Sequence, residues 1–319
     1  MRLSPIAFAA ALALPAPVLA IPLEDASALY VFGDSLSDDG NLPSLIGGLA
    51  NVVVPSPPYF DFRFSNGPVW ADVAAGVVGA GENFAFGGAR ADGPGNGPFP
   101  IPDFDAQVSA FAGALGGAPA PGDALASVWF GANDIFQSVG TATLGDAILS
   151  AVEAIGSGIE RLGALGVDDF VVFNLPDLSR TPAFMGLDVA AAATRQFNDL
   201  LALEVAGAAG DVTLVDAEAL FEDLVADPAA FGAAFPSAAG ITVTDAPCLA
   251  GAFPAFEVCD DPSAYLFWDG VHPTTKVHGA VATAAQRALA DGPAVIPLPA
   301  GAPLLLLGLG ALGLARRRA

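Results

Sequence analysis

A serine that follows a short apolar segment is the first residue of this chain suited to nucleophilic chemistry. Residues 30–32 are apolar, and the tripeptide Gly33-Asp34-Ser35 comes directly after them. Parallel α/β sheets collect their chemistry at the carboxyl ends of strands, so a serine at that place can attack a carbonyl carbon if a base and an oxyanion hole are present. The alternative interpretation of the tripeptide alone is an ordinary turn, which glycine, aspartate and serine all favour.

An aspartate and a histidine near the other end of the chain have the types and spacing that complete a catalytic triad. Asp269 and His272 are three residues apart, and Pro273 restricts the backbone after them. In a triad, the imidazole takes the serine proton while a carboxylate orients the ring and stabilises the imidazolium. The second histidine of the chain, His278, falls in a predicted surface helix, so His272 is the expected base. The alternative is a helix-entry turn in which Asp269 only caps.

Two further segments carry groups that suit an oxyanion hole, which needs preorganised donors aimed at the oxygen that becomes negative. Gly87 and Gly88 are adjacent, and glycine lets a backbone N–H approach a ligand closely. Asn133 follows the apolar run 128–130, and its side chain can donate an N–H. A plain turn is the alternative for each segment. Together with the serine and the Asp/His pair, however, the segments supply every group type that acyl transfer needs.

Other motifs are absent or poorly placed. No Gly-x-Ser-x-Gly occurs, and the Gly-x-Gly-x-x-Gly at residues 308–313 stands in an apolar terminal segment without a preceding strand. Metal-dependent phosphoester hydrolysis is an alternative chemistry for the acidic residues, but two histidines make a two-metal site the weaker interpretation. We therefore expect neither a metal nor another cofactor. The ligands in that alternative would be Asp34, Asp38, Asp39, Asp269 and His272.

The elements that must position these residues alternate between helix and strand. Residues 143–165 carry apolar side chains at three- or four-residue steps, which predicts a helix, and the apolar run 169–174 predicts a strand. A second helix and strand are predicted over 189–206 and 212–216, and a last helix runs from Pro273 to residue 289. Residues 92–98 are rich in glycine and proline and predict a loop. This alternation favours a mostly parallel sheet with helices on both faces.

The blocks together resemble the SGNH hydrolases, specifically the GDSL lipase/esterase family, over residues 28–289. Residues 33–38 match the nucleophile block, residues 131–134 the Gly-x-Asn-Asp block and residues 269–273 the last block. The resemblance implies a three-layer α/β/α sandwich of flavodoxin-like type. It also implies that Ser35 is the nucleophile, His272 the base and Asp269 its orienter. The implied oxyanion donors are the N–H groups of Ser35 and Gly88 and the amide of Asn133.

The function that follows is a secreted serine ester hydrolase acting on acyl esters of lipids or small alcohols through an acyl-Ser35 intermediate. Transfer of the acyl group to another alcohol and deacetylation of a polysaccharide are alternatives on the same site. An alternative of another class is a surface-displayed binding module that has lost turnover, although all five site positions carry competent residues.

The two ends of the chain predict where the protein works. Residues 1–20 combine Arg2, an apolar stretch and small residues before position 21, which is typical of a secretory signal peptide. We place the hydrolase domain at residues 21–292. Residues 293–319 hold Pro-Leu-Pro-Ala, an apolar run at 301–315 and three arginines. Fifteen residues reach about 22 Å as a helix, less than the ~30 Å core of a bilayer.

This last segment resembles the VPLPA-type PEP-CTERM sorting signals of Gram-negative bacteria. The resemblance implies processing by an exosortase-type enzyme and a location outside the cell or on its surface. The alternative is a tail anchor that stays in the membrane.

The charge and cysteine content of the chain indicate which binding partners to exclude and whether a disulfide forms. The chain has 11 basic and 34 acidic residues, and without the four arginines of its two ends the body has 7 against 34, a net charge of −27. Such a surface argues against nucleic-acid binding. Cys248 and Cys259 are the only cysteines, and in an exported protein they are expected to form one disulfide. A free or metal-binding pair is the alternative.

Overall fold

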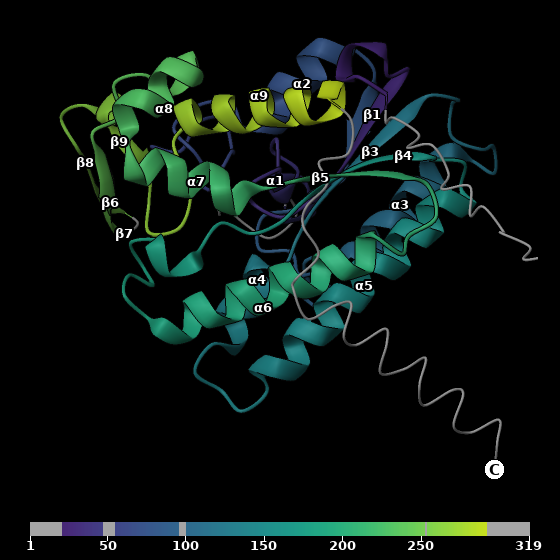
Figure 1. Ribbon diagram of the computed structural model, residues 1–319, viewed down its shortest axis with the longest axis horizontal. Helices are drawn as coiled ribbons and strands as arrows, with labels where there is room; N and C mark the ends of the chain where they lie inside the picture. Colours follow the sequence, from purple (N-terminus) through teal and green to yellow (C-terminus); the bar gives the residue numbers. More distant parts are fainter. Residues whose placement is uncertain (1–20, 47–54, 96–99, 253, 292–319) are drawn as a thin grey trace, which may run out of the picture.

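A five-stranded parallel sheet forms the centre of the fold. The computed structural model describes residues 21–46, 55–95, 100–252 and 254–291. Within them the strand order is β2-β1-β3-β4-β5, and each neighbouring pair is parallel (Figure 1). This is the flavodoxin-like order, in which the strand order reverses beside β1. The strands are β1 (Ala28–Gly33), β2 (Gly81–Asn83), β3 (Ala124–Trp129), β4 (Asp169–Phe173) and β5 (Asp211–Val215).

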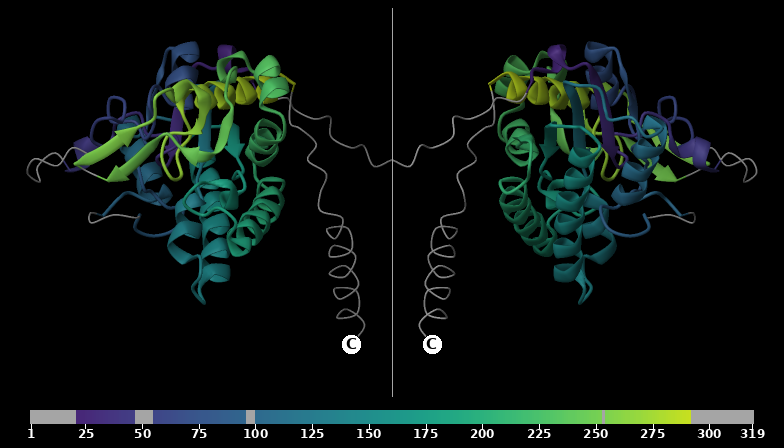
Figure 2. Two further views of the ribbon diagram at one scale, coloured as in Figure 1. Left: turned by 90° about the vertical axis from the view of Figure 1, so that its left-hand side faces the viewer. Right: turned by 90° about the vertical axis from the view of Figure 1, so that its right-hand side faces the viewer.

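The strands are apolar because helices cover both faces of the sheet. Every residue of β3 and β4 is buried, as expected for parallel strands between two helical layers. One layer contains α2, α7, α8 and α9, and the other contains α3, α4, α5 and α6 (Figures 1 and 2). The predicted α/β/α sandwich is therefore confirmed. The helices are α2 (Trp70–Val78), α3 (Phe104–Leu115), α4 (Ala132–Ser138), α5 (Leu144–Ala164), α6 (Asp188–Val205), α7 (Ala217–Ala226), α8 (Pro228–Ala234) and α9 (Thr275–Asp291).

The helix α5 shows how closely apolar spacing predicted an element. Its bounds, Leu144–Ala164, differ from the expected 143–165 by one residue at each end. Ile148, Val152, Ile155 and Ile159 are buried along one face, because side chains three and four residues apart lie on the same side of a helix.

Short elements surround the carboxyl edge of the sheet. The segment α1 (Leu42–Ile46) follows β1, and the pair β6 and β9 and the hairpin of β7 and β8 form two small separate sheets. Their bounds are β6 (Val243–Pro247), β7 (Leu249–Ala252), β8 (Ala255–Val258) and β9 (Tyr265–Phe267). Four 3₁₀ turns occur among the described residues: η1 (Leu23–Asp25), η2 (Leu178–Arg180), η3 (Pro236–Ala238) and η4 (Pro262–Ala264).

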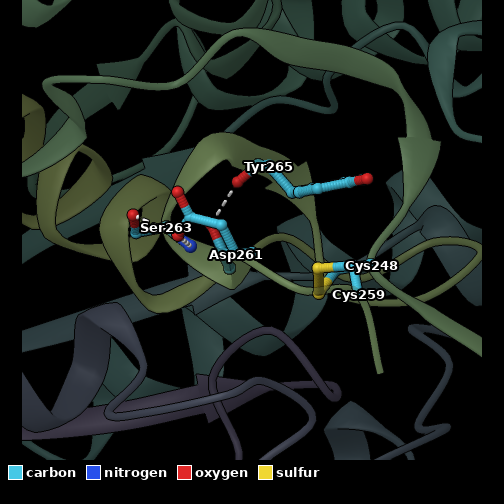
Figure 3. The surroundings of a disulfide bond; sticks show 6 residues. Cys248, Cys259, Asp261, Ser263 and Tyr265 are labelled. Atoms are coloured by element: carbon cyan, nitrogen blue, oxygen red, sulfur yellow. Dashed lines mark hydrogen bonds between the residues drawn. A yellow bond between two sulfur atoms is a disulfide. The ribbon is translucent and has the colours of Figure 1, made fainter. Parts of the chain in front are cut away.

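The expected disulfide is present and closes the β7–β8 hairpin. Cys248 and Cys259 are bonded, and the residues they join directly precede β7 and follow β8 (Figure 3). A second apolar cluster gathers around the bond, apart from the main core. It contains Cys248, Leu249 and Trp268, with Tyr59, Phe256, Cys259 and Tyr265 packed against them.

One expectation about α9 is wrong. His278 was expected on the surface, but its side chain is completely buried, and neither ring nitrogen has a hydrogen-bond partner within the described part of the chain. Burial lowers the pKa of His278 to about 3, so the ring is neutral. A neutral imidazole fits an apolar interior, where the charged form would be costly.

The predictions for the two ends of the chain, residues 1–20 and 293–319, lie outside the described residues. Among the residues that are described, no helix has both the length and the apolar character needed to span a bilayer.

Candidate active site

Residues from opposite ends of the chain form a continuous hydrogen-bonded series at the carboxyl edge of the sheet. Ser35 follows β1, and its Oγ lies 2.8 Å from His272 Nε2. His272 Nδ1 lies 2.7 Å from Asp269 Oδ2. The sequence separation between serine and histidine is 237 residues, so only the tertiary fold brings them together. This is the geometry of nucleophile, base and orienting carboxylate.

Asp269 uses its two carboxylate oxygens for different tasks. Oδ1 accepts hydrogen bonds from the backbone N–H groups of Val271 (2.9 Å) and His272 (2.8 Å), which folds residues 269–272 into a tight turn. Oδ2 faces the imidazole. Helix α9 begins only at Thr275, so Asp269 does not cap it. The carboxylate thus builds the turn and orients the ring at the same time.

The charges of this pair stabilise each other. Burial alone would raise the pKa of Asp269, but the nearby His272 and hydrogen bonds from His272, Tyr59 and Val271 bring it down to about 2. Burial disfavours the charged form of His272, yet Asp269 and, more weakly, Asp34 raise its pKa above the ordinary value. Asp269 is therefore a carboxylate at neutral pH, and it favours the imidazolium that forms when His272 takes a proton.

Buried polar side chains hold the nucleophile loop in place. Gln107 from α3 accepts a hydrogen bond from the N–H of Gly33 (3.0 Å) and donates one to its carbonyl (2.9 Å). Asp34 accepts the N–H of Leu36 at 3.0 Å. Burial raises the pKa of Asp34 to about 7, even though this hydrogen bond and His272 lower it. These contacts fix the backbone on both sides of Ser35.

The Gly87-Gly88 turn is tied to the same loop. Asp38 Oδ2 accepts the N–H of Gly87 at 2.7 Å, and Asp38 Oδ1 accepts those of Gly40 and Asn41. Gly88 has a φ of +81°, a conformation that favours glycine. In the described part of the chain, the backbone N–H groups of Ser35 and Gly88 donate to no protein acceptor. The two predicted backbone donors therefore border the site without a competing partner.

Asn133 lies at the start of α4, beside these groups. Its amide nitrogen donates to the carbonyl of Ala89 at 2.9 Å and lies 3.3 Å from Asp34 Oδ2. Gly131, with a φ of +113°, precedes the helix, and a Cβ there would fall 2.3 Å from the ring of Phe197. The glycine lets the chain turn sharply at the end of β3, which places the amide on the wall of the cavity described below.

The neighbouring residue, Asp134, forms hydrogen bonds with the segment that follows the Gly87-Gly88 turn. Its buried carboxylate accepts the N–H groups of Ala91 (3.0 Å) and Asp92 (3.3 Å) and pairs with Arg90 Nε at 3.3 Å. These bonds connect the segment after β2 with the one after β3. Gly88 and Asn133 consequently hold fixed positions relative to each other.

A cavity of about 440 Å³ opens beside Ser35 and extends along the sheet edge to α7. Its walls are mostly apolar, and the exposed residues Arg180 and Glu222 also border it. The candidate catalytic groups Ser35, Gly88, Asn133 and His272 line part of it. The apolar walls include Phe64, Ile101, Phe136, Leu175, Pro176, Leu178, Phe221, Val225, Leu266, Phe267 and Val271.

A comparison with family models identifies the family of the chain. The model of the GDSL-like lipase/acylhydrolase family matches residues 29–285, which include every predicted site residue. The chain belongs to this family. The residues that carry the resemblance in sequence are thus the residues that the fold brings to one edge of its sheet.

Relatives of this GDSL hydrolase differ in the reactions that their names state. A phosphatidylcholine-sterol acyltransferase of Aeromonas hydrophila is 30% identical, with 80% of this chain and 88% of the relative covered. An acetylesterase of Thermothelomyces thermophilus is 25% identical, covering 82% and 87%. Among solved structures, an acetylxylan esterase from Geobacillus stearothermophilus matches with a TM-score of 0.46 at 13% identity, covering 82% of this chain and 93% of its own.

Two side chains that contact residues of the GDSL site were not predicted from the sequence. Tyr59 donates a hydrogen bond to Asp269 Oδ2 at 2.6 Å, and Gln107 holds Gly33. Tyr59 lies outside the three blocks matched above, so the resemblance gave no signal for it. Gln107 lies on a helix with no motif around it, so its sequence offered no signal.

Proposed function

We propose that this GDSL hydrolase cleaves carboxylic esters through an acyl-enzyme intermediate on Ser35. The hydrogen-bonded series from Ser35 through His272 to Asp269 is the observation that carries the proposal. His272 Nε2 takes the hydroxyl proton as Ser35 Oγ bonds to the ester carbonyl carbon. The N–H groups of Ser35 and Gly88 and the Asn133 amide stabilise the resulting oxyanion.

The intermediate collapses when the bond to the alcohol oxygen breaks. His272 returns its proton to that oxygen, so the alcohol leaves in neutral form and the acyl group stays on Ser35. A water molecule then loses a proton to His272 and attacks the same carbonyl carbon. Breaking of the bond to Ser35 Oγ releases the acid and restores the serine hydroxyl.

The shape of the cavity favours substrates with an apolar acyl chain over acetyl esters. The cavity runs from Ser35, after β1, to Phe221 and Val225 on α7, after β5. β5 is three strand spacings from β1, a distance of about 14 Å. An acetyl group would leave most of this apolar surface in contact with water, whereas a longer chain would bury it.

We therefore expect the rate on p-nitrophenyl esters to rise from acetate to medium chains. A tryptophan at Val225 would fill the α7 end of the cavity, so Val225→Trp should lower kcat/KM about tenfold on the longer esters and leave the acetate rate unchanged. Val73→Trp, at an exposed position on α2, is the control. An unaltered chain-length profile in Val225→Trp would contradict the assignment of the cavity to the acyl chain.

Labelling of the wild-type protein tests the function itself. A fluorophosphonate should modify Ser35 stoichiometrically, and peptide mapping should find the label on no other serine. Labelling at a different residue, or protein that neither reacts nor hydrolyses any ester of the panel, would contradict the proposed function.

Acyl transfer is the second candidate, because a relative with 30% identity is a phosphatidylcholine-sterol acyltransferase. In transfer, an acceptor alcohol replaces water in the second half of the reaction at the same acyl-Ser35. Incubation of a phosphatidylcholine with the enzyme and a sterol distinguishes the reactions, since hydrolysis releases fatty acid and transfer produces a sterol ester.

We also propose that the protein is exported and loses both ends. Residues 1–20 and 293–319 have the sequence patterns described above, and the disulfide suits an oxidising compartment. Intact-mass analysis of protein from its natural host should find a start near Ile21 and an end near residues 297–300. A membrane-bound species that retains Arg316, Arg317 and Arg318 would support the tail anchor instead.

A further inference from the structure

The Asp269 oxygen that faces the imidazole, Oδ2, has a second partner that the proposed mechanism has not used. The hydroxyl of Tyr59 donates to Oδ2 at 2.6 Å, the same oxygen that faces His272 Nδ1 at 2.7 Å. Burial and the nearby Asp269 both raise the pKa of Tyr59 above its ordinary value, so the phenol keeps its proton and remains a donor. A charged acceptor makes this a strong class of hydrogen bond.

The loop that carries Tyr59 contacts the turn that carries Asp269 and His272 at several points. The Phe64 ring lies 5.1 Å from the ring of His272. Ser65 Oγ donates to the carbonyl of Pro273 at 3.0 Å, and Asn66 Oδ1 accepts the N–H of Thr275 at 2.9 Å. Residues 59–66 therefore contact residues 269–275 along their length, although about 200 residues separate the two segments.

The ring of Tyr59 packs against three aromatic side chains. Phe64, Phe256 and Trp268 surround it at centroid distances of 6.2, 6.1 and 6.3 Å, each near edge-to-face. Phe256 belongs to the β7–β8 hairpin that the Cys248–Cys259 disulfide closes (Figure 3). Aromatic pairs favour edge-to-face contacts, so this packing favours the ring orientation in which the hydroxyl points at Asp269.

We propose that Tyr59 is a positioning residue for the ester hydrolysis proposed above. Its hydroxyl holds Asp269 in the orientation that pairs with His272, and it takes up part of the negative charge of the carboxylate. The second effect moderates the attraction between Asp269 and the imidazolium. His272 then stays neutral, and able to accept the Ser35 proton, at lower pH than it would beside an unmoderated carboxylate.

Tyr59→Phe removes the hydroxyl and keeps the ring. Asp269 then loses a donor, its full charge acts on His272, and the pKa of His272 rises. A base must be neutral to accept a proton, so the acid limb of kcat/KM should move to higher pH, by about half a unit. We also expect kcat to fall about tenfold with KM unchanged, because a hydrogen bond to a charged group is lost at the reacting end.

The other charged or titratable groups near His272 are the same in the wild type and in the Tyr59→Phe variant. They are Asp269 from the same turn, Asp34 from the loop after β1 and His278 from α9. Their titration cancels when the two pH profiles are compared. Tyr265→Phe is the matched control, because Tyr265 belongs to the same apolar cluster but, within the described part of the chain, its hydroxyl donates no hydrogen bond to Asp269. Its rate and pH profile should equal those of the wild type.

The measurement is the pH dependence of p-nitrophenyl ester hydrolysis, with the rate of fluorophosphonate labelling of Ser35 as a second readout on folded protein. An unchanged acid limb in Tyr59→Phe would overturn the inference, whether or not kcat falls. Active wild-type enzyme labelled at Ser35 would then leave the proposed function intact. A wild type that is neither active nor labelled would instead contradict the proposed function.

Discussion

Replacement of Ser35 by alanine is expected to reduce ester hydrolysis by at least about 10⁴-fold while the protein stays folded. Without the Oγ nucleophile no acyl-enzyme forms, and only the oxyanion donors and substrate binding remain to accelerate attack by water. The side chain is small and nearly buried, 8% exposed, so its loss removes little packing. Initial rates on a medium-chain p-nitrophenyl ester measure the effect, and thermal melting confirms the fold.

Ser37 provides a control only two residues away. It is completely buried, and its Oγ accepts a hydrogen bond from Trp70 Nε1 at 3.0 Å instead of contacting His272. Ser37→Ala should therefore lower the melting temperature and keep most of the activity. If Ser35→Ala retained the wild-type rate, the acyl-Ser35 mechanism would be wrong.

Replacement of Asn133 by alanine should lower kcat by roughly 10²–10³-fold and leave KM nearly unchanged. The amide is placed to stabilise the oxyanion, which exists only after attack, so its loss affects the transition state more than the bound ester. The bond to the carbonyl of Ala89 orients the amide, and the other N–H leaves its longer 3.3 Å contact with Asp34 Oδ2 to donate to the oxyanion. Steady-state kinetics on one ester separate the two constants.

Asn133→Asp distinguishes this role from a structural one. The aspartate has the same shape, but it replaces a donor with a negative charge and would repel the oxyanion, so its kcat should be at least as low as that of the alanine variant. If both variants kept the wild-type kcat and only melted earlier, Asn133 would serve the fold around Ala89 and not the reaction.

Local patterns of apolar residues in the sequence predicted the helices and strands discussed here. Apolar spacing placed α5 within one residue of its ends, and the apolar run 169–174 became β4. Such patterns are readable because the residues that make a helix or a buried strand are neighbours in the chain. The prediction that His278 lies on the surface was wrong. A single polar residue on a helix does not show which other element of the fold will pack over it.

Short blocks in the sequence determined the types of the candidate catalytic groups, and the tertiary structure decided their partners. Ser35, Asp269 and His272 were predicted because each stands in a compact segment with its own turn residues. The bond from Tyr59 to Asp269 spans 210 residues, and the cavity beside Ser35 takes its walls from the segments after several strands. Contacts between residues so far apart in the sequence form only when the sheet and its loops pack together. The local sequence pattern therefore does not predict them.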